Sequence, residues 1–76
     1  MLKREFTNPR NFVLNRVEDE SGVSGTGPVA EGTVYWNGKA TLVWRTETSS
    51  VAVYDSIEDL ERVHGHGGKT KIEWLN

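Results

Sequence analysis

The fold of this chain is decided by the stretch Thr33-Val34-Tyr35-Trp36-Asn37-Gly38-Lys39-Ala40-Thr41-Leu42. Its Asn37-Gly38 pair is the strongest short-range signal for a two-residue hairpin turn, because both central residues of that turn need a positive φ. Alternating β-branched and aromatic residues flank the pair on both sides. We therefore expect a hairpin whose strands run from Val29 to Trp36 and from Lys39 to Thr46.

The register of this hairpin decides which side chains share a face of the sheet. A two-residue turn places Tyr35 opposite Ala40 and Thr33 opposite Leu42. The inward face is then expected to carry Thr33, Tyr35, Ala40, Leu42 and Trp44, and the other face Val34, Trp36, Thr41 and Val43. Neither face is plainly polar, so we expect the second face to be covered by the helix, by the N-terminal segment or by another copy of the protein. Of these we favour an interface between subunits, formed by Val34, Trp36 and Val43.

Further strands are predicted on either side of the hairpin. Apolar and polar residues alternate from Asn11 to the acidic run at 18–20, a short β-branched strand runs from Ser50 to Tyr54, and a last strand runs from Thr70 to Leu75. Residues 1–10 show no period and are expected to form a lead-in segment to one small β-rich domain, residues 11–76. The predicted fold is mainly β: a small, strongly curved antiparallel sheet or open barrel of about five strands.

One short α-helix is predicted before the last strand. Ser56 is a suitable N-cap, and Asp59 follows it at the capping-box position. Ile57, Leu60 and Val63 are expected to form the buried edge of the helix. Gly65 is expected to end it in a left-handed conformation.

Composition excludes several classes of function. The 76 residues contain no cysteine, which excludes disulfides and thiolate metal sites and fits a cytoplasmic protein. The net charge of −2 provides no basic field for duplex nucleic acid, and no apolar run is long enough to span a membrane. So small a domain has a thin core, and oligomerisation would help to stabilise it.

Two glycine clusters carry the chemistry that favours a binding site. Ser21-Gly22-Val23-Ser24-Gly25-Thr26-Gly27 alternates glycines with hydroxyl residues, so that backbone N–H groups and hydroxyls can approach an anion closely. His64-Gly65-His66-Gly67-Gly68-Lys69 adds imidazoles and an ammonium group. Each cluster also has an ordinary interpretation as a flexible connection, and residues alone leave these alternatives open.

Catalytic, metal and cofactor motifs are not expected. The segment 25–30 fits G-x-G-x-x-A, but a strand follows it where a dinucleotide fold needs a helix. Gly68-Lys69-Thr70 lacks the first glycine of a phosphate-binding loop, since Val63 stands there. His64 and His66 are too few to hold a metal ion. With no nucleophile elbow or other recognisable constellation, we do not expect an enzyme.

The two glycine motifs also resemble those of a widespread family of small bacteriophage proteins. The resemblance covers about residues 12–74 and rests on the SGxSGTG stretch at 21–27, Glu31-Gly32, Trp44, and the HGHGG stretch at 64–68. The family is similar to the phage anti-CBASS sponge proteins, small oligomers that sequester the cyclic nucleotide signals of bacterial immunity.

The resemblance implies a homo-oligomer in the host cytoplasm that binds a cyclic dinucleotide or trinucleotide without catalysis. Phosphates would be taken by the first loop and by cations, and bases would stack on aromatic residues. The ligand-binding residues expected on this view are Ser21, Ser24, Gly25, Thr26, Gly27, Arg45, Tyr54, His66, Gly67 and Lys69. The alternative is a phage accessory protein that inhibits a host protein by direct contact through the face around Trp36.

Overall fold

The computed structural model describes residues 8–18 and 26–76. Five strands and one α-helix make up its regular structure, together with a 3₁₀ turn, η1, at His66–Gly68. The elements in chain order are β1 (Arg10–Arg16), β2 (Gly27–Val34), β3 (Ala40–Trp44), β4 (Val51–Tyr54), α1 (Ile57–His64) and β5 (Thr70–Trp74). The prediction of a mainly β fold of about five antiparallel strands, with one short α-helix before the last strand, is therefore confirmed.

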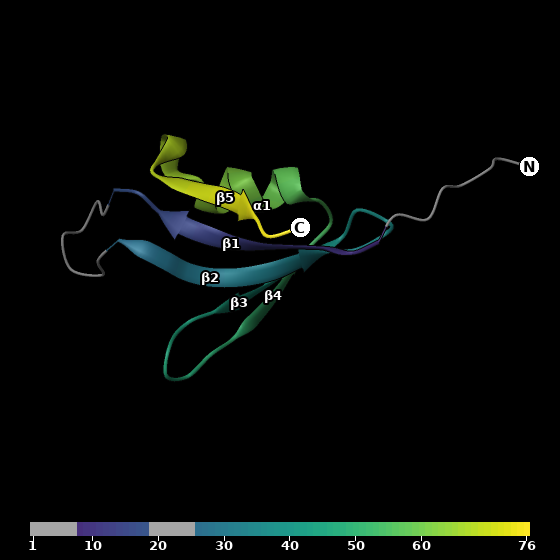
Figure 1. Ribbon diagram of the computed structural model, residues 1–76, viewed down its shortest axis with the longest axis horizontal. Coiled ribbons are helices and arrows are strands. Elements are labelled where there is room, and N and C mark those ends of the chain that lie inside the picture. Colours follow the sequence, from purple (N-terminus) through teal and green to yellow (C-terminus); the bar gives the residue numbers. More distant parts are fainter. Residues whose placement is uncertain (1–7, 19–25) are drawn as a thin grey trace, which may run out of the picture.

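The strands form one open antiparallel sheet in the order β4-β3-β2-β1-β5. β1 lies between β2 and β5, so the first strand of the chain joins the hairpins to the last strand. β4 and β5 form the two edges, and α1 connects them by crossing one face of the sheet (Figure 1). The chain therefore builds an open sheet with one helix-covered face.

The core lies between α1 and the sheet. Leu60 of α1 and the sheet residues beneath it are fully or almost fully buried. The face that α1 covers, called here the helix face, presents Phe12, Leu14, Ala30, Gly32, Ala40, Leu42 and Ile72. The opposite face, called the open face, presents Asn11, Val13, Glu31, Thr33, Thr41, Val43, Val51, Val53, Lys71 and Glu73.

The predicted hairpin is present, but its predicted register is wrong. Val34 pairs with Ala40, and Tyr35 N–H donates to Lys39 O at 2.8 Å, which leaves three residues in the turn. Gly38 N–H donates to Tyr35 O at 2.9 Å, and Gly38 has a φ of 90°. This is the pattern of a β-turn extended by a left-handed glycine, a loop that suits Asn-Gly as well as the two-residue turn does.

The added turn residue shifts the register by one, so the side chains of β2 change face relative to those of β3. Thr33 and Tyr35 do not share the face of Ala40, Leu42 and Trp44, as expected from a two-residue turn. Their places are taken by Ala30, Gly32 and Val34, which pair with Trp44, Leu42 and Ala40. A one-residue shift of register exchanges every side chain between the two faces, because the strand period is two.

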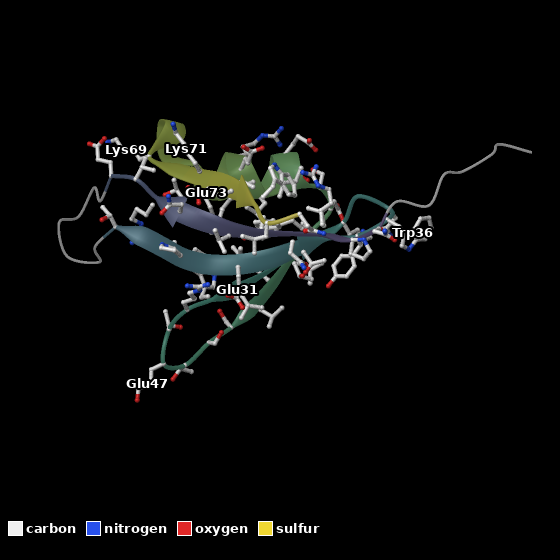
Figure 2. All side chains as sticks on the ribbon, in the orientation of Figure 1. Glu31, Trp36, Glu47, Lys69, Lys71 and Glu73 are labelled. Carbon is white, nitrogen blue, oxygen red and sulfur yellow. The ribbon has the colours of Figure 1, made fainter. Side chains whose placement is uncertain are left out.

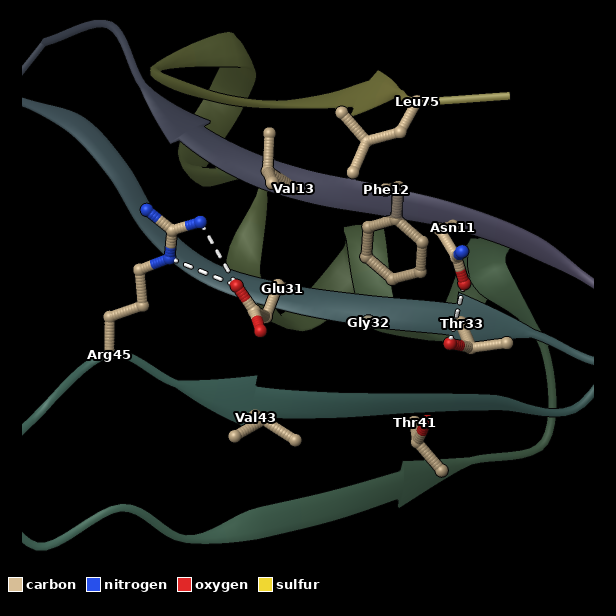
Figure 3. Close-up of a pocket in the computed structure, with 10 residues that line it drawn as sticks. All are labelled: Asn11, Phe12, Val13, Glu31, Gly32, Thr33, Thr41, Val43, Arg45 and Leu75. Carbon is tan, nitrogen blue, oxygen red and sulfur yellow. Dashed lines mark hydrogen bonds and ion pairs between the residues drawn. The ribbon is translucent and has the colours of Figure 1, made fainter.

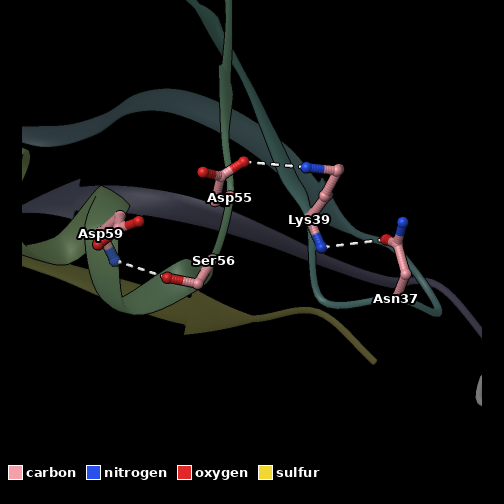
Figure 4. Close-up of polar contacts among 5 residues, drawn as sticks. All are labelled: Asn37, Lys39, Asp55, Ser56 and Asp59. Carbon is pink, nitrogen blue, oxygen red and sulfur yellow. Dashed lines mark hydrogen bonds and ion pairs between the residues drawn. The ribbon is translucent and has the colours of Figure 1, made fainter.

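The helix begins as predicted and ends differently. Ser56 is the N-cap, and its Oγ accepts from the N–H of Asp59 at 3.1 Å (Figure 4). Gly65 has a φ of −72°, so the predicted left-handed cap is wrong. Val63 is exposed, so its predicted burial is wrong, and the half-buried His64 packs its ring 5.0 Å from that of Trp44. The ring contact with β3 turns the last helical residue toward the sheet.

Gly32 lets the aromatic core residue approach the sheet closely. A Cβ atom at Gly32 would lie 2.6 Å from Cζ of Phe12 and 2.1 Å from the carbonyl oxygen of Thr41. Phe12 is fully buried and pairs with Gly32 across β1 and β2. We expect Gly32→Ala to lower the free energy of unfolding by about 2 kcal/mol or more, because neither the backbone nor the packed ring can give way.

Chemical denaturation of Gly32→Ala checks this prediction, with Thr33→Ala as the matched control. Thr33 is the next residue of β2 and lies on the open face, where its hydroxyl donates to Asn11 Oδ1 at 2.9 Å. The control should lose less than about 1 kcal/mol, since that hydrogen bond is exposed. Equal stabilities of the two variants would contradict the account of the core.

Candidate functional site

Gly27, the last residue of the first glycine cluster, and Lys69, the last residue of the second, lie at one end of the sheet, called here the loop end. Arg16, the last residue of β1, pairs with Gly27 on one side and with Thr70 on the other. The backbone N–H groups of Val17 and Glu18 both donate to the carbonyl oxygen of Lys69, at 2.8 and 3.2 Å. The chain leading into the first cluster is thus tied directly to the end of the second.

The backbone of the second cluster depends on glycine. Gly67 and Gly68 have φ values of 64° and 95°, a region that other residues rarely adopt. The carbonyl oxygen of Gly65 accepts from the N–H groups of Gly68 and Thr70, at 3.0 and 3.1 Å. Nothing lies within 4 Å of the positions that Cβ atoms would take at Gly67 and Gly68. The backbone there is consequently open to a close-approaching ligand.

Several predicted ligand-binding residues lie at the loop end. Thr26 and Gly27 lead into β2, and Gly67 and Lys69 lead into β5. Lys69 is half-buried, and its Nζ lies 4.0 Å from Oε1 of Glu18. His66 begins η1. The predicted residues Ser21, Ser24 and Gly25 lie outside the described residues.

A β-bulge shapes the start of β2. Leu14 pairs with Ala30 and Asn15 with Pro28, so Val29 is an extra residue on β2. Bulges increase local twist and redirect side chains, and they are common beside binding sites. The carbonyl oxygen of Val29 accepts from the backbone N–H of Arg45 at 3.0 Å, which anchors Arg45 next to the bulge.

Arg45 lies at the same end of the sheet but points over the open face. Its Nε and Nη2 donate to one carboxylate oxygen of Glu31, Oε2, at 3.2 and 2.9 Å. This ion pair is about half exposed on both sides. The guanidinium of Arg45, a predicted ligand-binding group, is therefore already paired with the Glu31 carboxylate of β2.

The ion pair closes one end of a hollow on the open face. The hollow has a volume of about 310 Å³, and Figure 3 shows it between the Arg45–Glu31 pair and the Asn11–Thr33 hydrogen bond. Its lining residues are Asn11, Phe12, Val13, Glu31, Gly32, Thr33, Thr41, Val43, Arg45 and Leu75. Sequence reasoning missed this hollow, because only the observed register places Glu31 opposite Val43.

Tyr54 is not brought to the loop end. It pairs with Ala40 beside the hairpin turn, at the other end of β4. Its hydroxyl lies 2.5 Å from Nε2 of His64, and the two rings meet edge to face at 5.7 Å. The structure uses Tyr54 to hold the C-terminal turn of α1 against β3 and β4, together with Trp44.

The three predicted interface residues do not share a face. Val34 lies on the helix face and packs against the core. Val43 lies on the open face, and Trp36 lies in the hairpin turn with about half of its surface exposed. The shifted register separates Val34 from Val43, so they cannot form the continuous apolar face that was predicted.

An ion pair links the hairpin to the start of α1. Nζ of Lys39 lies 2.9 Å from Oδ1 of Asp55, the residue before the N-cap (Figure 4). The hydrogen bond from Lys39 and its positive charge lower the pKa of Asp55 below the ordinary value of 3.8. A lowered pKa in the folded state means that the pair stabilises the fold above the ordinary value and that this contribution is lost as the pH falls.

We expect the Asp55 carboxyl to titrate below 3.8 in the folded protein and to return to about that value in Lys39→Gln. NMR titration of the side-chain carboxyl carbon measures both midpoints. Lys71→Gln is the control, because Lys71 lies on β5 at the opposite edge of the sheet. A midpoint for Asp55 that Lys39→Gln leaves unchanged would show that the pair does not persist in solution.

Metal and membrane sites are not indicated in residues 8–18 and 26–76. No three His, Asp or Glu side chains of this part of the chain gather closely enough to hold a metal ion. Among the same residues, no helix has the length and apolar character needed to cross a membrane.

Comparison with known proteins identifies a family that the chain matches. The sequence model of a family described as Acb5 phage protein matches residues 9–76, nearly the whole chain. No curated protein and no solved structure matches the chain. The match includes both glycine clusters and every strand of the sheet.

Proposed function

The chain belongs to the Acb5 phage protein family, a phage family of the anti-CBASS type, and on this premise we propose that it sequesters a cyclic oligonucleotide signal of the host in the host cytoplasm. The bound ligand is a cyclic dinucleotide or trinucleotide, which the protein holds without converting it. Sequestration of this kind removes the signal from the host effector and needs no catalytic group.

The observation that carries this proposal is that the described ends of the two glycine clusters, at Gly27 and at Lys69, lie on either side of the end of β1. The hydrogen bonds of Val17 and Glu18 to Lys69 join segments separated by about fifty residues. Backbone N–H groups in glycine-rich turns form concave sites that favour anions, and lysine neutralises phosphate charge. The anti-CBASS type of the family suggests a cyclic oligonucleotide as ligand, and the phosphodiester groups of its ring are anions of this kind.

A homo-oligomer is part of the proposal. A chain of 76 residues offers a small surface, and a site shared between subunits would enclose more of a ligand than one subunit could. The open face supports this view, because Val51 and Val53 are about two-thirds exposed beside Val43. Apolar side chains gathered on one sheet face are typical of contact surfaces.

A second candidate function is inhibition of a host protein by direct contact. Tyr35 and Trp36 are exposed at the hairpin turn, 40% and 49% respectively. Exposed aromatic residues are typical anchors of protein–protein contacts. Figure 2 shows Trp36 and Lys69 at opposite ends of the molecule, so the two candidate functions rely on different surfaces.

Thermal melting against a panel of cyclic dinucleotides and trinucleotides tests the proposal. A ligand at a hundred times its dissociation constant stabilises the fold by about 2.7 kcal/mol, which raises the Tm of a domain of this size by roughly 10 °C or more. We expect such a shift with at least one nucleotide. Lys69→Ala should reduce it strongly, since this removes the ammonium group and keeps the carbonyl oxygen that Val17 and Glu18 use.

Lys71→Ala is the matched control, because it makes the same change of charge two residues away on an exposed position of β5. It should keep the full shift. A panel without any shift would overturn sequestration of cyclic nucleotides. If Trp36→Ala then abolishes capture of a host protein that Lys69→Ala still binds, the second candidate function is the correct one.

A further inference from the structure

We propose that the hollow on the open face seats a nucleobase of the nucleotide ligand. This inference rests on the proposed function and adds a second contact region to it. The loop end would then hold phosphate, and the hollow would hold a base. The chemistry of the hollow decides which part of a nucleotide fits.

The charge in the hollow favours a neutral group. Its two charged side chains, Arg45 and Glu31, compensate each other through hydrogen bonds of 2.9 and 3.2 Å. A phosphate placed there would meet the Glu31 carboxylate and would have to compete with it for the guanidinium. A neutral heterocycle meets neither cost, so the hollow suits a base rather than a phosphate.

The walls of the hollow match a flat group with an apolar body. Val13, Val43 and Leu75 supply apolar surface, and Val13 is 8% exposed although it lies on the open face. The volume of about 310 Å³ is at the lower end of the range for small-molecule sites. A single base with its sugar is a ligand of that scale.

Polar groups stand at both ends of the hollow to bind the edge of a base. In the part of the chain that the structure describes, Oε1 of Glu31 has no hydrogen-bond partner, since both contacts from Arg45 reach Oε2. A carboxylate oxygen accepts from the amino and ring N–H groups of bases. At the other end, the hydroxyl of Thr33 and the amide of Asn11 lie within reach of the opposite edge (Figure 3).

The position of the hollow relative to the loop end suits a ligand of more than one nucleotide. Glu31 and Gly27 lie four residues apart on β2, which separates them by at most about 13 Å at the rise of a β-strand, since the bulge at Val29 lies between them. Arg45 stands between them, because its backbone N–H is bound to Val29. A ring of two or three nucleotides can place one base in the hollow and a phosphate beyond Arg45.

Filling the hollow tests this inference. Val43→Phe adds a ring to the lining, and Val63→Phe makes the same change at an exposed position of α1, outside the lining. The dissociation constant of the cyclic nucleotide that gives the largest thermal shift is measured by calorimetry for both variants. We expect Val43→Phe to weaken binding at least tenfold and Val63→Phe to leave it unchanged. Sedimentation of each free variant reports its oligomeric state.

Glu31→Ala is the second variant, since it keeps the volume open and removes the carboxylate. Its pair with Arg45 is half exposed, so the fold should persist while binding weakens about tenfold. Full binding by Val43→Phe and Glu31→Ala would overturn the base site and leave sequestration standing. A Val43→Phe variant that changes its oligomeric state but binds normally would assign the hollow to a subunit contact. Absence of binding by the unmodified protein would overturn both proposals.

Discussion

The close approach of the Phe12 ring to the backbone of Gly32 is the constraint on which this structure depends. A five-stranded sheet covered by a helix of eight residues can bury only a few large side chains, and Phe12 is the largest of them. The ring fits beneath α1 because β2 has no side chain at that point. Packing at this density makes the central strands rigid, and the loops and edges are attached to that rigid part.

β1, the strand that carries Phe12, also organises the loop end. β1 pairs with β2 and β5 at once, so it brings the start of β2 and the start of β5 to its own last residue, Arg16. α1 returns the chain from the β4 edge to the β5 edge and so closes this arrangement. Glycines are used where the backbone needs positive φ, at Gly27, Gly67 and Gly68. The meeting of distant segments at the loop end is therefore a consequence of strand order.

Local sequence signals predicted the elements well and the register poorly. Alternation of apolar residues located the strands, and Ser56 located the start of the helix. Asn37-Gly38 predicted a hairpin, yet the same pair occurs in turns of two and of three residues. The length of the turn sets the register, and a change of one residue places the side chains of β2 on the other face relative to those of β3. The position of the bulge at Val29 depends on packing and left no distinct local signal.

The candidate site was predictable to the extent that it depends on residue type. The glycine clusters were recognised from the sequence, and two such loops on one small scaffold were expected to form a binding site. The hollow at Glu31 and Arg45 depends on the register and could not be found without it. Tyr54 was expected to bind ligand, but the structure places it against His64 because an edge strand must hold the helix.

The central claim is that this phage protein holds a cyclic oligonucleotide without changing it. The most direct measurement is to mix the protein with a limiting amount of the nucleotide that it binds, remove the free ligand by filtration, and denature the protein by heat. Mass spectrometry then identifies what is released. The account predicts near-complete retention before heating and release of the intact cyclic nucleotide afterwards. Release of a linear or otherwise altered nucleotide, or passage of the ligand through the filter, would contradict it.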